Sequence, residues 1–150
     1  MSLSLRGPRV PLIPSIRFIK DTPGFFRECV QRYGDPFIVQ LPSGRIVVTG
    51  GVVGWDETGR FPEGFGAQSR KLFENIRAIL AEGGAEPRQI VRLTWYVVDL
   101  DEYAASLKDL GRAYREVIGP HYPAMAVVQV VRLVEPEARL EIEATAVVPA

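Results

Sequence analysis

The order in which β-rich runs and helical patterns alternate limits the fold more than any other feature of this sequence. Two stretches, residues 65–80 and 103–118, repeat apolar side chains at spacings of three and four, which is the pattern of a helix with one buried face. The β-rich runs around them are residues 37–41, 46–50, 90–98, 127–133 and 140–148. This β-β-α-β-α-β-β order predicts an α+β fold.

The first two β-rich runs and the last one carry further evidence for strands. Residues Pro42-Ser-Gly-Arg45 separate the first two runs and predict a β-hairpin. In the last run, apolar and polar side chains alternate, so the strand has one face toward a core. The apolar set is Leu140, Ile142, Ala144 and Ala146, and the other is Glu141, Glu143 and Thr145.

The first 35 residues differ from the rest in composition. They hold six Lys or Arg against three Asp or Glu, and four prolines interrupt the backbone. Thr22-Pro23 has the form of a helix start, and apolar residues then follow at helical spacing up to Gly34. We therefore predict an N-terminal arm with a short helix at residues 1–35 and one α+β domain at residues 36–150.

Charge and composition exclude several classes of function. Basic and acidic residues balance at 18 each, so no overall field favours a nucleic-acid partner. Cys29 and His121 are the single residues of their types, which disfavours a disulfide framework and a metal site. No run approaches the roughly 20 apolar residues of a membrane span. We expect a cytoplasmic protein with no membrane partner and no cofactor.

Residues 46–150 resemble the Rid (reactive intermediate deaminase, YjgF-type, RidA) family along their whole length. The resemblance rests on ordered, correctly spaced motifs: Thr49-Gly50-Gly51 where the family shows Ser-Gly-Gln, Thr58-Gly59, Gln68 with Asn75, Val98-Asp99, His121-Tyr122-Pro123-Ala124 and Glu141-Ile142-Glu143-Ala144. It implies a mixed β-sheet with two helices packed on one face, in a chorismate-mutase-like fold. It also implies a homotrimer in which three sheets form a barrel, with clefts between subunits that bind a small-molecule ligand.

In the family, these clefts hydrolyse 2-imino acids to keto acids and ammonia. An arginine that follows Pro-Ala clamps the substrate carboxylate, while a glutamate and a backbone carbonyl position water. Here the arginine position is Met125, and an asparagine position four residues after Tyr103 is Leu107. Phe37 replaces a pocket tyrosine of the first strand. A methionine offers no charge, so a bound carboxylate would lose roughly 1.5–3 kcal/mol.

Other pocket positions are retained. Thr49, Gly50, Tyr103 and Glu141 match the family, and Gly51 adjoins them. The resemblance therefore predicts Glu141 as the catalytic residue. The predicted substrate-binding set is Phe37, Thr49, Gly50, Gly51, Tyr103, Leu107 and Met125.

A second resemblance covers the N-terminus. Residues 6–50 are similar to the start of bacterial cytochrome P-450 enzymes, through the proline-rich lead, Tyr33-Gly-Asp-Pro-Phe37 and Val47-Val-Thr-Gly50. The haem-binding parts of that family have no counterpart downstream, so we expect no haem. Because both families place a hairpin at this point, we interpret the chain as a natural or constructed recombination.

Simpler interpretations remain open for these residues. Met125 and Leu107 could be packing residues, and Glu141 could be a solvated carboxylate on a strand. Two functions also remain open. The chain could bind or hydrolyse a small imine, enamine or related carbonyl compound without a carboxylate, or it could be a non-catalytic trimeric binding module. A ribonuclease is disfavoured by the balanced charge.

Overall fold

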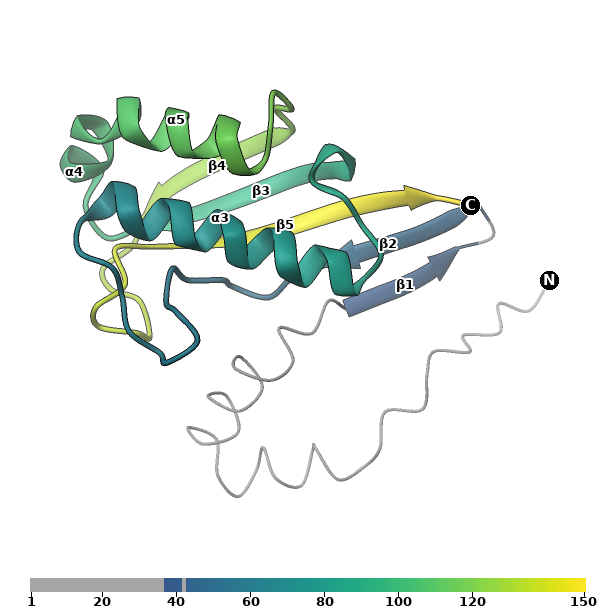
Figure 1. The fold of residues 1–150 in the computed structure, drawn as a ribbon, viewed down its shortest axis with the longest axis horizontal. Helices are drawn as coiled ribbons and strands as arrows, with labels where there is room; N and C mark the ends of the chain where they lie inside the picture. Colours follow the sequence, from purple (N-terminus) through teal and green to yellow (C-terminus); the bar gives the residue numbers. More distant parts are fainter. Residues whose placement is uncertain (1–36, 42) are drawn as a thin grey trace, which may run out of the picture.

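The computed structural model describes residues 37–41 and 43–150 (Figure 1). The predicted arm of residues 1–35, with its helix and Cys29, lies outside the described residues. So do most of the segment that resembles a cytochrome P-450 and the side chain of Phe37.

A five-stranded mixed sheet forms one layer of the molecule, in the order β1-β2-β5-β3-β4. β3 and β4 are parallel, while the other neighbours are antiparallel. The α+β fold with a mixed sheet is thereby confirmed. The strands are β1 (Phe37–Leu41), β2 (Gly44–Val48), β3 (Ile90–Val97), β4 (Ala124–Gln129) and β5 (Leu140–Pro149).

The helices cover one face of this sheet (Figure 1). They are α3 (Phe65–Glu82), α4 (Leu100–Ala105) and α5 (Leu107–Val117), with a short 3-10 turn at Pro87–Gln89. The core between the layers includes Phe73 and Ile76 of α3, together with Trp95 and Ile142 of the sheet, all at most 3% exposed. Burial of each such side chain contributes roughly 1.5–3 kcal/mol.

Several boundaries differ from the sequence prediction: β2 begins at Gly44 rather than at residue 46, and β4 begins at Ala124 rather than at residue 127. The second helix is divided at Ser106, and its first part begins earlier because the Asp99 carboxylate accepts bonds from the backbone N–H groups of Asp101 and Glu102. β4 ends at Gln129 rather than continuing to residue 133. Its partner β3 ends at Val97, opposite Gln129, and the pairing stops there after a last bond from the Val130 N–H to the Val97 carbonyl.

The predicted alternation along β5 is confirmed. Leu140, Ile142, Ala144 and Ala146 are buried under the helices. Glu141, Glu143, Thr145 and Val147 therefore lie on the opposite face of the sheet, which we call the open face. None of the helices in the described part of the chain is long and apolar enough to cross a membrane.

Candidate functional site

Glu141 lies half-buried on the open face, opposite Tyr96 of β3. Partial burial raises the pKa of its carboxyl above the ordinary value, and the nearby carboxylates of Glu143 and Glu135 act in the same direction. The Tyr96 hydroxyl donates a hydrogen bond to Glu143 over 3.0 Å. Glu141 thus has the environment of a group whose proton is exchanged closer to neutral pH than that of an exposed glutamate.

The segment after β2 runs beside Glu141. The Thr49 N–H donates to the Ala144 carbonyl, and Val52 exchanges two backbone bonds with Ile142. Gly50 and Gly51 therefore face the single residue Glu143, which makes this segment a β-bulge. Bulges of this kind re-aim neighbouring side chains.

Thr49 fastens one end of the bulge. It is 3% exposed, and its hydroxyl accepts from the Ala144 N–H at 2.9 Å while donating to the Gly50 carbonyl at 2.8 Å. The hydroxyl is therefore engaged by the backbone in the single chain.

Gly51 lies directly against the predicted catalytic side chain. A Cβ atom built on Gly51 would come within 1.7 Å of Oε1 of Glu141, whereas one built on Gly50 would meet nothing within 4 Å. The Glu141 carboxylate therefore occupies the space that a side chain at position 51 would need.

The side-chain amides of two α3 residues bond the segments that flank the contact between Gly51 and Glu141. Gln68 donates to the Glu137 carbonyl and accepts from the Arg139 N–H, both at 3.0 Å. Asn75 donates to the carbonyls of Val53 and Trp55 at 2.9 and 3.0 Å. Sequence reasoning matched Gln68 and Asn75 to a family motif without giving them a role, although a polar Gln68 within an apolar helix face was a usable signal.

The remaining predicted residues lie elsewhere. Tyr103 of α4 is half-buried and packs edge-on against Phe65 at a ring distance of 6.1 Å. Leu107 is the first residue of α5 and is 49% exposed, and Met125 of β4 is 41% exposed. Within one chain the structure brings together Thr49, Gly50, Gly51 and Glu141.

Met125 and Glu141 do not meet in one chain. Met125 is opposite Leu93, whose side chain is buried under the helices, while Glu141 is opposite Tyr96 on the open face. Three residues along β3 and two strand spacings separate these rows, or about 10 Å along the strands and about 10 Å across them. Their side chains project from opposite faces of the sheet.

Trp95 and His121 both have structural roles. Trp95 is 3% exposed and packs edge-on against Phe73 in the core. The His121 ring bonds the Ile90 carbonyl at 2.6 Å, as a residue that holds its loop would. In the described part of the chain, no group of three or more His, Cys, Asp or Glu side chains is placed to hold a metal ion.

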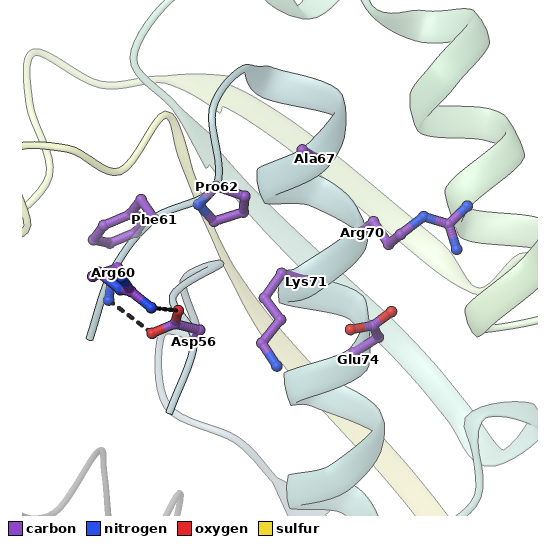
Figure 2. A pocket seen from close by; sticks show the side chains of 8 residues that line it. All are labelled: Asp56, Arg60, Phe61, Pro62, Ala67, Arg70, Lys71 and Glu74. Atoms are coloured by element: carbon purple, nitrogen blue, oxygen red, sulfur yellow. Dashed lines mark hydrogen bonds and ion pairs between the residues drawn. The ribbon is translucent and has the colours of Figure 1, made fainter. Parts of the chain in front are cut away.

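A separate hollow of about 550 Å³ lies between the loop at residues 56–62 and α3 (Figure 2). No predicted site residue lines it. Each of its cations already has a carboxylate partner: Arg60 pairs with Asp56, Lys71 with Glu57, and Arg70 with Glu116. With its charges paired and open to solvent, this hollow has less capacity for chemistry than the Glu141 site.

Comparison with known proteins places this geometry in a family. The protein-family model described as endoribonuclease L-PSP, which covers the YjgF and RidA proteins, matches residues 29–148 of this chain. The chain belongs to the YjgF/RidA family. The Rid resemblance is thus confirmed, and it begins before residue 46, so that the β1–β2 hairpin is part of the family domain. The resemblance of residues 6–50 to a cytochrome P-450 stays a prediction.

Relatives within the YjgF/RidA family include proteins named as deaminases. A RutC family protein of Haemophilus influenzae is 35% identical over 75% of this chain and 86% of its own length. A 2-iminobutanoate/2-iminopropanoate deaminase of Salmonella typhimurium is 33% identical, with 75% and 87% covered. The crystal structure of Escherichia coli TdcF with bound serine has 32% identity and a TM-score of 0.63, and covers 74% of this chain and 85% of its own.

Proposed function

We propose that this YjgF/RidA protein binds and hydrolyses a small imine or enamine that carries no carboxylate. Glu141 positions the attacking water, and Met125 and Leu107 form an apolar wall of the cleft. The observation that carries the proposal is a half-buried carboxylate with a raised pKa beside the Gly50-Gly51 bulge, in a chain with methionine at the family's arginine position.

The reaction requires little beyond a placed carboxylate. Glu141 accepts a proton from water as the oxygen attacks the C=N carbon, and the nitrogen gains a proton as the double bond opens. The resulting carbinolamine then loses ammonia, and a carbonyl compound remains. A glutamate whose pKa is raised toward the working pH is suited to both proton transfers.

The proposed substrate class follows from Met125. A substrate carboxylate placed beside a thioether would lose a charge-assisted hydrogen bond worth roughly 1.5–3 kcal/mol. Leu107 offers an apolar surface, so an uncharged compound leaves no buried charge unpaired. Serine, which is bound to TdcF of Escherichia coli, carries a carboxylate and is expected to bind this chain weakly.

The proposal includes the homotrimer implied by the resemblance. Since Met125 and Glu141 project from opposite faces of one sheet, a pocket that contains both needs two copies of the chain. The open face also carries apolar side chains, among them Val128, which is 45% exposed, and Val147, which is 41% exposed, with Ile46 beside Val147. Contact between such faces would remove these side chains from water.

The test uses two substrates that differ in the group beside the imine, which is a carboxylate in 2-iminopropanoate and an uncharged carboxamide in 2-iminopropanamide. We expect the protein to release ammonia from the amide and Glu141→Gln to slow this release by about 10²–10⁴-fold. If the wild type binds the amide but releases no ammonia above background, and Glu141→Gln changes neither result, the chain is the alternative, a non-catalytic trimeric binding module.

A further inference from the structure

We infer that Gly51 is a positioning residue for Glu141. Because position 51 has no side chain, the Glu141 carboxylate can pack directly against the bulge. The effect on catalysis rests on the proposed function, but the packing of the Glu141 carboxylate against Gly51 is a property of the ligand-free chain.

The fit between the two residues is close. A Cβ on Gly51 would lie 1.7 Å from Oε1, 2.6 Å from Cδ and 3.0 Å from Cγ of Glu141. All three atoms belong to the flexible end of one side chain. An alanine at position 51 would therefore move the carboxylate and leave the packed backbone in place.

The bulge cannot step aside to make room, because it is fixed at both ends. Thr49 and Val52 bond to Ala144 and Ile142 of β5. Beyond them, a Cβ on Gly54 would meet the Gln68 carbonyl oxygen of α3 at 2.2 Å, so this backbone is already packed on the helix. The Glu141 side chain is the part with freedom to respond.

The groups around the carboxylate set the sign of the response. Glu143 and Glu135 act on Glu141 through their charge, and Tyr96 is bonded to Glu143. Burial is the largest cause that raises the pKa of Glu141. A carboxylate that is pushed off the bulge becomes better hydrated, so this cause weakens and the pKa falls.

The chain supplies a matched control one residue away. Gly50 and Gly51 are both exposed, and neither is among the glycines with a positive φ. A Cβ on Gly50 meets nothing within 4 Å. Gly50→Ala thus repeats the loss of glycine flexibility in the same bulge without touching Glu141.

The experiment is an NMR titration of the Glu141 side-chain carboxyl in the ligand-free full chain, assigned by the loss of its signal in Glu141→Gln. We expect a lower titration midpoint in Gly51→Ala than in the wild type, and an unchanged midpoint in Gly50→Ala. Both variants should unfold at the wild-type temperature. An unchanged or raised midpoint in Gly51→Ala, or equal shifts in both variants, would overturn the inference.

Ammonia release from 2-iminopropanamide separates this inference from the proposed function. If both hold, Gly51→Ala lowers the rate at least about tenfold, since a displaced carboxylate no longer aligns the water. If the titration midpoint of Glu141 shifts in Gly51→Ala but the wild type is inactive, Gly51 still positions Glu141 and the proposed reaction is rejected. Wild-type activity that Gly51→Ala leaves unchanged would reject the positioning role.

Discussion

Met125 and Leu107 set the expected substrate range at the scale of single residues. We predict that Met125→Arg with Leu107→Asn adds hydrolysis of 2-iminopropanoate, because the guanidinium provides the bidentate partner that a carboxylate needs. Ammonia release measures the gain. Leu107→Asn alone is the matched control, since it lacks the guanidinium. Continued inactivity of the double variant would mean that other pocket contacts have diverged.

The raised pKa of Glu141 has a consequence for stability. The folded chain holds this proton more tightly than the unfolded chain, so the stabilising contribution is complete below the ordinary pKa of about 4.5 and is lost as pH rises through the raised value. Glu141→Gln cannot ionise. We therefore predict that the wild type loses stability relative to Glu141→Gln as pH increases across this window, as measured by thermal unfolding. A constant difference would contradict the raised pKa.

The same shift sets the acid side of the pH profile. A general base must be ionised, so activity should rise with pH through the raised pKa of Glu141 rather than through the value of an exposed glutamate.

At the scale of elements, α3 joins the two segments that flank the site. Gln68→Leu would leave the Glu137 carbonyl and the Arg139 N–H without their partners at a part-buried site. We predict a loss of roughly 1–3 kcal/mol in the free energy of unfolding, measured by urea denaturation. Arg77→Leu, on an exposed position of the same helix, should change stability by less than about 0.5 kcal/mol. Equal losses of stability in both variants would argue against a stabilising role for the two Gln68 hydrogen bonds.

Helices and strands could be predicted where the spacing of apolar residues and the positions of turn residues indicated the same element. The face of α3 and the alternation along β5 follow from local spacing. The end of β4 depends on a tertiary partner instead. β4 stops where β3 stops, and the residues that pair there, Val97 and Gln129, lie far apart in the sequence.

The candidate site shows the same division. The family motifs point to Glu141 and to the Thr49-Gly50-Gly51 segment, which the fold brings together. Sequence spacing alone could not indicate that Gly51 lies against the Glu141 carboxylate, or that Met125 projects from the other face. Both depend on strand register, in which a shift of one residue reverses the face of every side chain.

At the scale of the whole molecule, the open face is the proposed contact between copies. We predict that Val147→Asp weakens the trimer, because it places a charge among apolar side chains of that face. Sedimentation or light scattering would show a smaller species at equal concentration. Ala78→Asp, on an exposed position of α3, should leave the mass unchanged. A wild-type monomer, or a trimer unaffected by Val147→Asp, would contradict this interface.

The central claim is that this site hydrolyses an imine without a carboxylate clamp. The most direct measurement compares ammonia release from freshly generated 2-iminopropanoate and 2-iminopropanamide by the wild-type protein. We predict hydrolysis of the amide and no rate above background for the acid. Robust turnover of 2-iminopropanoate would contradict the account and identify an ordinary 2-imino acid deaminase that manages without the arginine.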